Sequence, residues 1–312
     1  MRSTESSIRV VKDHSGEDAN LLPVPIAAVT TAVIPQQAAS DEMLIGLWLH
    51  GRSEATQEAY RFDAKRLARF IGKALGQMTL ADLQAFSDNL EQSGLAPASQ
   101  HRILAAVKSL FAFGCRLGYL PFDTARPLRL PTLRNRLAER ILDEGQVQRM
   151  IALEAHPRNR AILLLLYGAG LRVSEACGLK WRDCQVRENG GQVTVHGKGG
   201  KTRSILIPLS VWESLLALRS GDGDDAPVFR SRKNGHLRKA AMERLVRRAA
   251  LRAAVQRAVS PHWLRHAHAS HALDRGAPIH VVQATMGHSS LSSTSMYVHA
   301  RPTDSSSRYL PL

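Results

Sequence analysis

Cysteine is scarce in this sequence of 312 residues, which contains only Cys115, Cys177 and Cys184. Their number is odd and no two of them form a Cys-x-x-Cys pair, so the sequence offers no disulfide framework. Unpaired cysteines are typical of proteins in a reducing compartment. We therefore expect a cytoplasmic protein.

Long hydrophobic runs are also missing. The stretch at 161–167 is far too short to span a bilayer. Residues 21–34 are apolar, but Pro23 and Pro25 interrupt them and acidic residues precede them, unlike the basic start and unbroken centre of a signal peptide. We expect a soluble chain with no membrane partner, in which residues 1–40 form a disordered tail.

Acidic residues are few relative to basic ones. The chain has 42 Lys and Arg against 27 Asp and Glu, a formal net charge of +15. Such an excess favours a polyanionic partner, most simply nucleic acid, because basic groups that bind phosphates release counterions. Charge alone is a weak indication, since many basic proteins are merely soluble.

Residues 41–121 show helical periodicity throughout. Apolar side chains recur every three or four residues in four stripes, and Gly94 and Pro97 separate the last two. We predict a small four-helix bundle that forms its own domain, with most of its basic residues outside the stripes. The residues expected to face inward are Leu44, Leu47, Trp48, Tyr60, Leu67, Phe70, Ile71, Leu80, Leu83, Phe86, Leu90, Ile103, Leu104, Val107, Leu110 and Phe111.

Residues 122–140 have the composition of a linker. Pro127 and Pro131 keep such a segment extended. Its guanidinium groups suit a chain that runs along phosphates, and a plain solvated linker is the alternative. The arginines concerned are Arg126, Arg129, Arg134, Arg136 and Arg140.

Residues 141–303 combine helices with a few strands. A nearly all-apolar helix at 158–169 is expected to be buried and to end at Gly170, followed by Arg172 and by a short helix that carries Glu175. The periodicity then changes from 3.6 to 2, which indicates strands. These strands are predicted at 181–187, 192–196 and 203–207.

A glycine-rich turn, Gly197-Lys198-Gly199-Gly200, joins the last two strands. Its glycines let the backbone approach a ligand closely. By itself Lys198 is an ordinary exposed hairpin lysine, and Lys201 is a neighbouring candidate for any role it has. Helices are expected at 209–219 and 237–259. The second carries a basic face that could lie along DNA, formed by Arg244, Arg247, Arg248, Arg252 and Arg257.

Ser260 and Pro261 predict the start of a helix, which places His262 and Arg265 on one face of its first turn. Gly276 and Pro278 end that helix and open the next.

Gly287 ends this second helix, His288 follows it in a loop, and Tyr297 lies on a last short helix. Groups that can donate to, protonate or attack a phosphodiester are thus spread over separate elements. This arrangement is better suited to a shared site than to a packed core.

Four motifs stand in order over about residues 140–300. They are G-A-G-L-R-V-S-E-A-C-G-L around Arg172, V-T-V-H-G-K-G-G-K-T-R-S-I-L-I-P-L around Lys198, H-W-L-R-H from His262, and M-G-H-S-S with S-M-Y-V-H up to Tyr297. The set resembles the tyrosine recombinases, the family of phage integrases and Xer-type recombinases. Ala169 and Met286 depart from its commoner Thr and Leu, and neither is a reacting group.

The resemblance implies a mainly helical fold with a small β-sheet. Residues 41–121 would form a SAM-like core-binding domain, residues 122–140 a linker, and residues 141–303 a mixed α/β catalytic domain. The tail at 304–312 would dock on a neighbouring protomer or fold back on its own domain. Four copies would assemble on two specific double-stranded DNA sites, with a paralogous recombinase as an alternative partner.

The resemblance also assigns roles to residues. Tyr297 would attack phosphorus and remain joined to the DNA as a 3′-phosphotyrosine, before a Holliday junction is formed and resolved. Arg172 and Arg265 would hold the non-bridging oxygens with forked charged donors, and His288 would add a hydrogen bond.

In the same scheme, Lys198 would protonate the leaving 5′-oxygen and His262 would help to move the tyrosine proton. Glu175 would orient its neighbours, Arg244 and Arg248 would contact DNA, and no metal or cofactor would be needed. His266, although common at its place in the family, would not react.

Other interpretations remain open. The crowded histidines His262, His266, His268 and His271 suggest zinc, although no His-Glu-x-x-His motif or cysteine pair accompanies them. A lone tyrosine near a C-terminus is usually a half-buried aromatic. The alternative functions are a type IB topoisomerase, which uses similar chemistry on one duplex, and a catalytically idle DNA-binding architectural protein.

Overall fold

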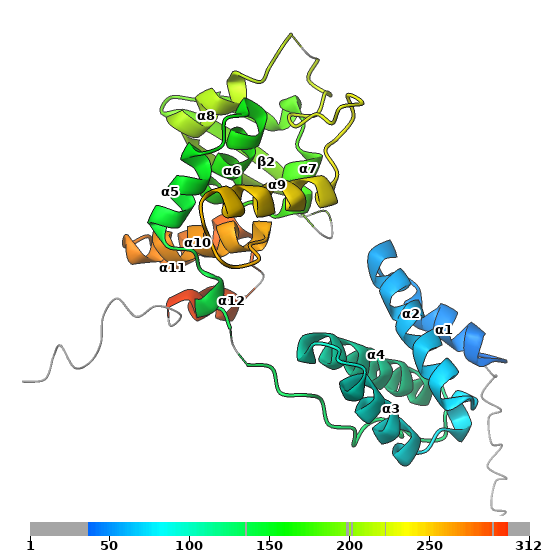
Figure 1. The fold of residues 1–312 in the computed structure, drawn as a ribbon. Coiled ribbons are helices and arrows are strands. Elements are labelled where there is room, and N and C mark those ends of the chain that lie inside the picture. Colours follow the sequence, from blue (N-terminus) through cyan, green and yellow to red (C-terminus); the bar gives the residue numbers. More distant parts are fainter. Residues whose placement is uncertain are drawn as a thin grey trace, which may run out of the picture. The chain divides into compact units, whose positions relative to one another are not determined.

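The computed structural model describes residues 37–134, 136–197, 200, 202–221, 223–288 and 290–298. The chain divides into two compact units between Leu133 and Arg134 (Figure 1). The expectations for residues 1–36, for Lys198 and Lys201, and for the tail at 304–312 lie outside the described residues.

Helices make up the N-terminal unit. Thr79 caps α3 through a reciprocal capping box with Asp82, and Pro97 occupies the first turn of α4, where its missing N–H costs nothing. Ala38 is buried and Ser40 caps α1, so ordered packing begins before that helix. The elements are α1 (Asp41–Leu49), α2 (Glu54–Ile71), a 3-10 turn η1 (Leu75–Gln77), α3 (Leu80–Gln92) and α4 (Pro97–Arg116).

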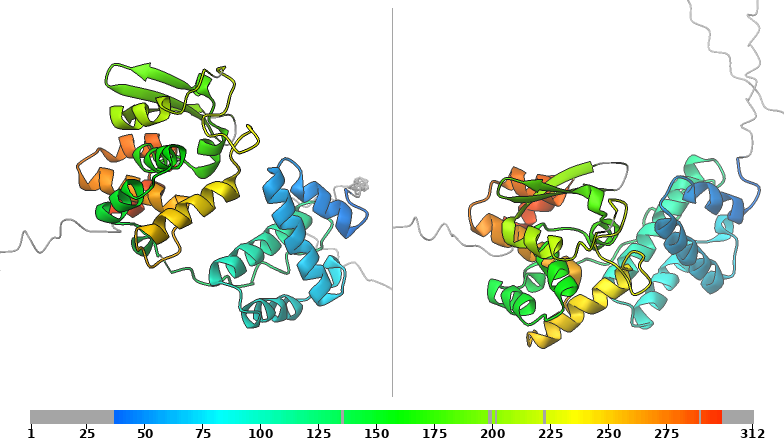
Figure 2. Two further views of the ribbon diagram at one scale, coloured as in Figure 1. Left: turned by 45° about the horizontal axis from the view of Figure 1, so that its top comes forward. Right: turned by 90° about the horizontal axis from the view of Figure 1, so that it is seen from above.

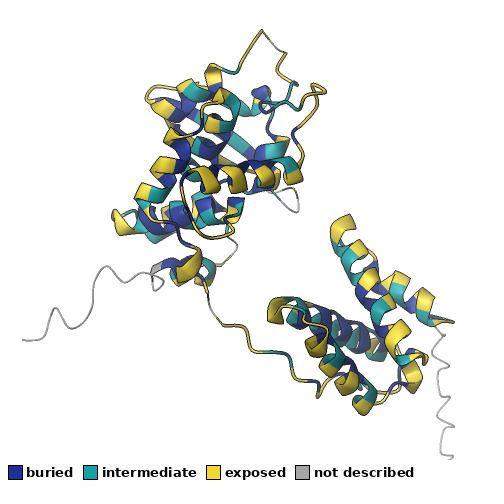
Figure 3. Cartoon of the chain, in the orientation of Figure 1, coloured by how far each residue is buried: buried dark blue, intermediate teal, exposed yellow. Residues whose placement is uncertain are grey.

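This unit has its own apolar core, which lies where the helices face one another (Figure 3). Trp48 of α1 stacks on Tyr60 of α2, and its indole N–H donates to Ser109 of α4. The carboxylate of Asp63 is buried and forms a bidentate ion pair with Arg102, which compensates its charge.

The C-terminal unit combines helices with one sheet. Its elements are η2 (Ala138–Arg140), α5 (Glu144–Ala152), α6 (Pro157–Gly168), α7 (Val173–Gly178), η3 (Trp181–Asp183), β1 (Cys184–Arg187), β2 (Gly190–His196), β3 (Thr202–Pro208), α8 (Leu209–Leu216), α9 (Lys239–Arg252), α10 (Pro261–Asp274), α11 (Ile279–Met286) and α12 (Ser292–Val298). The main core of this unit surrounds α6, whose central residues are buried on all sides. The predicted mainly helical fold with a small sheet is therefore confirmed.

The sheet is antiparallel, with the strand order β1-β2-β3. Val193 pairs with Ile205, and Val195 pairs with Arg203. The alternating apolar residues of β2 and β3 point to one face, which α8 covers, as the left view of Figure 2 shows. Arg203 shares this inward face with Ile205 and Ile207, which brings a charged side chain to the rim of the core.

Several details differ from the sequence expectations. Leu47 and Phe70, expected inside the bundle, are 42% and 43% exposed. The strand predicted from residue 181 begins only at Cys184, because Trp181 lies in a 3-10 turn and its N–H bonds the carbonyl of Ala226. The helix predicted to reach residue 259 ends at Arg252, since Ala254 adopts a left-handed conformation.

In the part of the chain that the structure describes, no helix is both long and apolar enough to cross a membrane. All three cysteines are free thiols, and each is partly buried.

Packing leaves no room for a side chain at Gly191 on β2. A Cβ atom built there would lie 2.2 Å from Cε3 of the Trp212 ring. We expect Gly191→Ala to lower the free energy of unfolding of the C-terminal unit by about 1–3 kcal/mol, because the indole must move out of a packed position. Urea denaturation followed by tryptophan fluorescence measures this change.

The control is Gly178→Ala at the end of α7, where an added Cβ meets no heavy atom within 4 Å. This substitution should change the free energy of unfolding by less than about 0.5 kcal/mol. Equal losses for the two variants would contradict the packing argument.

Candidate active site

A buried carboxylate binds two arginines near the start of β3. Glu175 on α7 accepts hydrogen bonds from Arg203 on β3 at 2.8 Å and 2.9 Å. It also accepts one from the Arg172 guanidinium at 2.9 Å and one from the Arg172 backbone N–H at 2.8 Å. Burial by itself raises the pKa of Glu175, but the hydrogen bonds from Arg203 and Arg172 hold it below its usual value. The carboxylate is therefore ionised and fixed in place.

Three arginines bind successive carbonyls at the C-terminal end of α11. Arg203 donates to the carbonyl of Thr285 at 2.8 Å, Arg265 donates to that of Met286, and Arg172 donates to that of Gly287 at 3.0 Å. These carbonyls have no partner within the helix and carry its negative dipole end, so cations are favoured there. The loop that bears His288 is thereby tied to three other segments of the chain.

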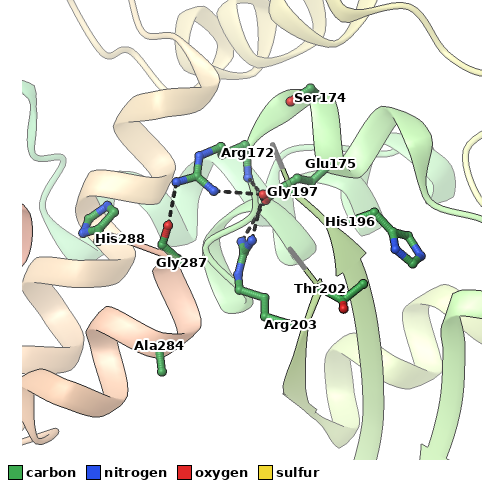
Figure 4. A pocket seen from close by; sticks show the side chains of 10 residues that line it. All are labelled: Arg172, Ser174, Glu175, His196, Gly197, Thr202, Arg203, Ala284, Gly287 and His288. Carbon is green, nitrogen blue, oxygen red and sulfur yellow. Dashed lines mark hydrogen bonds and ion pairs between the residues drawn. The ribbon is translucent and has the colours of Figure 1, made fainter. Parts of the chain in front are cut away.

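These groups border a cavity of about 620 Å³ (Figure 4). In Figure 4, Arg172 and Arg203 converge on Glu175, and the Arg172 guanidinium also reaches Gly287. The lining comes from α7 and the residue before it, the β2–β3 hairpin, and the end of α11 with the two residues that follow it. Its residues are Arg172, Ser174, Glu175, His196, Gly197, Thr202, Arg203, Ala284, Gly287 and His288.

The cavity region has more positive than negative charge. Glu175 faces two arginines, while the buried Arg265 donates to the carbonyls of Gly170 and Met286, which are neutral. Burial, and then the charge of Arg172, lower the pKa of Arg265 to about 10. It stays protonated near pH 7, so an anion that enters the cavity gains favourable electrostatic interactions.

Tyr297 lies beside this cavity and is 3% exposed. Its hydroxyl oxygen is 2.8 Å from Nδ1 of His266, and its ring stacks on that of His288 with centroids 6.2 Å apart and planes 7° apart. Burial raises the pKa of Tyr297, although the charge of Arg265 opposes this. Nδ1 of His288 is 2.9 Å from the hydroxyl of Thr294, which holds the ring in place.

The remaining predicted site residues occupy different positions. His262 lies at the start of α10 with an exposed side chain, and its ring centroid is 6.5 Å from that of His266. Lys198 lies outside the described residues. Of the five arginines expected on one face of α9 and beyond it, Arg252 pairs with Glu154 and Arg257 bonds the carbonyl of Glu139. All five, including Arg244, Arg247 and Arg248, are exposed.

Arg203 was missed in the sequence, although it had a readable signal, because an arginine alternates with Ile205 and Ile207 on the apolar face of a strand. His266 was considered in the sequence but was expected not to react. Its contact with Tyr297 could not be read there, since it joins residues 31 positions apart on different helices.

The histidines of α10 have protein partners rather than a shared metal geometry. Nδ1 of His268 lies 2.7 Å from the carbonyl of Tyr167, and Nδ1 of His271 lies 3.0 Å from the Tyr167 hydroxyl. Within the described ranges, no group of three or more His, Cys, Asp or Glu is arranged to hold a metal ion.

We expect the C-terminal unit to lose stability in acid. Burial is the main cause that lowers the pKa values of His266, His268 and His288 from 6.5 to about 4. Between these values the unfolded chain binds protons that the folded chain does not, so the free energy of unfolding falls as the pH is lowered through 6.5 towards 4. Urea denaturation at intervals between pH 7.5 and pH 5 measures this.

His288→Gln should reduce the slope of that dependence. His280→Gln, which replaces an exposed histidine on α11, is the matched control and should leave the slope unchanged. Parallel curves for the parent protein and His288→Gln would show that His288 does not cause the loss of stability in acid.

Two family models match the chain. The model described as "Phage integrase family" matches residues 140–304, and "Phage integrase, N-terminal SAM-like domain" matches residues 41–116. Among curated proteins, the tyrosine recombinase XerC of Xanthomonas campestris pv. campestris (strain B100) is 34% identical over 260 residues. This alignment covers 79% of this chain and 79% of that protein.

Solved structures share the fold. A XerH site-specific recombinase bound to palindromic difH substrate in a post-cleavage complex has a TM-score of 0.64 and 22% identity, over 84% of this chain and 82% of that chain. A lambda integrase tetramer bound to a Holliday junction also has a TM-score of 0.64, with 18% identity over 85% of this chain and 82% of that chain. The family models and the XerC relative establish that this chain belongs to the phage integrase family, whose members are the tyrosine recombinases.

Proposed function

We propose that this site-specific tyrosine recombinase cuts and rejoins DNA strands with Tyr297 as its nucleophile, through a 3′-phosphotyrosine link and a Holliday junction. The observation that carries the proposal is the excess of guanidinium groups around one carboxylate, directly beside a buried tyrosine. A phosphodiester supplies the missing negative charge. A phenol supplies a nucleophile whose phosphate ester can later be displaced.

Arg172 and Arg265 are assigned to the phosphate. Attack on phosphorus increases the negative charge on the non-bridging oxygens, and donors already fixed in place stabilise this charge most effectively. Arg172 is 37% exposed at the cavity, so its guanidinium has donors available for a ligand besides those it gives to Glu175 and Gly287. Arg265 is buried and adds its positive charge.

The other assignments follow from position or from the family motifs. His288 lines the cavity and is suited to donate a hydrogen bond to the phosphate. Glu175 orients both Arg172 and Arg203, so its part is positioning rather than reaction. Lys198 is assigned from its motif to protonate the leaving 5′-oxygen, and His262 from its motif to help move the tyrosine proton.

Double-stranded DNA is the proposed partner, and the basic surface around α9 supports it. Arg244 and Arg248 line a hollow of about 430 Å³ together with Arg158 and Arg232. Four guanidinium groups without a lining carboxylate suit the DNA backbone. The arginines of the linker add to the positive charge of the chain, and all five are exposed: Arg126, Arg129, Arg134, Arg136 and Arg140.

Assembly as a homo-tetramer on two recombination sites is part of the proposal. The lambda integrase neighbour is a tetramer on a Holliday junction, and the present chain shares its fold. Reciprocal strand exchange requires four nucleophiles, one for each strand that is cut.

Tyr297→Phe removes the nucleophilic hydroxyl and should abolish the covalent protein–DNA adduct while DNA binding persists. A suicide substrate with a nick near the cut site traps the adduct of the parent protein, which denaturing gel electrophoresis then quantifies. Recovery of as much 3′-phosphotyrosine from the Phe variant would refute the assignment. Cleavage should continue in EDTA, and a requirement for added Mg²⁺ would contradict the scheme.

Arg172→Ala or Arg265→Ala should slow single-turnover cleavage by several orders of magnitude. Loss of one fixed donor costs about 3–4 kcal/mol in comparable oxyanion sites. The matched control is Arg244→Ala with Arg248→Ala, which removes exposed arginines away from the cavity.

This double variant should weaken binding and reduce its salt dependence, yet cleave at nearly the parent rate when DNA is saturated. If it slowed saturated cleavage as much as Arg172→Ala did, the separation of catalytic from tethering arginines would be wrong.

A further inference from the structure

His266 is the one described residue that hydrogen-bonds the hydroxyl of Tyr297, with 2.8 Å between Nδ1 and the phenol oxygen. The two rings come from helices that pack together, α10 and α12, with centroids 5.7 Å apart and planes tilted by 42°. The contact involves the very atom that would attack phosphorus. It therefore bears on how that atom loses its proton.

The environment favours a phenol that donates to His266. Burial, then the nearby His262, Arg140, Arg265 and His288, lower the pKa of His266 to about 4, so its imidazole is neutral near pH 7. A neutral imidazole accepts at one nitrogen and donates at the other. If Nδ1 carried the proton, the buried phenol O–H would be left without a partner, which costs free energy. With the proton on Nε2, Nδ1 accepts from the phenol.

The neighbouring histidines are less well placed for this task. His288 lies nearly parallel to the tyrosine ring, and its Nδ1 is engaged by Thr294. His262 has no hydrogen bond to Tyr297, and its ring neighbours that of His266 instead. The sequence interpretation gave the tyrosine proton to His262, but the contact belongs to His266.

We propose that His266 is a catalytic residue that accepts the phenol proton of Tyr297 when this oxygen attacks the DNA phosphate, an inference that rests on the proposed nucleophile. The O–H bond breaks, its proton passes to Nδ1, and the electron pair of the phenol oxygen forms the new O–P bond. The P–O5′ bond breaks, and the 5′-oxygen keeps its electron pair and takes a proton from the general acid assigned to Lys198. On rejoining, the imidazolium returns its proton to the phenol oxygen.

Burial and the positive surroundings, which lower the pKa of His266 in the free protein, also make its imidazolium unfavourable there. A bound phosphate offsets part of that charge, so the proton acceptor becomes stronger once DNA is in place. His266 is therefore a better proton acceptor in the DNA-bound state than in the free protein.

The test uses His266→Gln in the full-length protein. A glutamine side chain can hydrogen-bond the phenol but cannot take its proton at neutral pH. Adduct formation on the nicked suicide substrate at saturating protein should slow about 10²–10⁴-fold, the range of general base catalysis. His262→Gln, which removes the rival proton acceptor, should slow adduct formation less.

Replacing Tyr297 by 3,5-difluorotyrosine distinguishes a proton-accepting role of His266 from a purely structural one. Its phenol is more acidic and partly ionised near neutral pH, so it needs the acceptor less. In the His266→Gln background this replacement should restore most of the lost rate, whereas a purely structural defect would not respond to phenol acidity. Rescue also shows that the variant is folded.

Parent-like cleavage by His266→Gln would overturn the role of His266. The role would also be overturned if 3,5-difluorotyrosine failed to restore cleavage in the His266→Gln variant. A rescue seen only in the His262→Gln variant would overturn it as well. Tyr297→Phe is run beside these variants. If it still forms the adduct, the nucleophile assignment fails and this proposal fails with it; if it does not, a parent-like His266→Gln overturns the proton acceptor alone.

Discussion

The last carbonyls of α11 are the constraint on which the site depends. Thr285, Met286 and Gly287 each present a carbonyl that the helix cannot use, and each is bound by an arginine from a different segment. One arginine comes from the sheet, one from α10 and one from the start of α7. Because these segments are far apart in sequence, the helix end holds them in a common geometry that no local interaction provides.

Glu175 completes this arrangement through charge. Its carboxylate binds Arg172 and Arg203, so these guanidiniums are fixed in direction before any ligand arrives. Arg265 has no such carboxylate, and burial, followed by the charge of Arg172, lowers its pKa. A site built this way is ready for an anion, because its donors need little rearrangement. Burial, together with the same positive charge, lowers the pKa values of His266 and His288 and keeps them neutral.

Neutral histidines matter most around Tyr297. The tyrosine is buried between the stacked ring of His288 and the hydrogen-bonding nitrogen of His266. The arginines attract the phosphate, and their charge adds to the burial that keeps the imidazoles neutral and able to accept protons.

The sequence by itself determined the four motifs, the helical N-terminal bundle and the order of helix, strand and helix in the second unit. Caps, glycines and apolar periodicity are local signals, so Pro97, Gly287 and the change of period near residue 190 could be read directly. Local signals also misled, as with the strand start at Cys184 and the exposed Leu47.

Only the tertiary structure decided which polar groups meet. Arg203 is 28 residues from Glu175, and Tyr297 is 31 residues from His266. Periodicity can assign a residue to a face, but the partner on that face depends on how separate helices and strands pack. That packing is set by the whole apolar core, so His266 became visible as a candidate proton acceptor only after α10 and α12 were placed side by side.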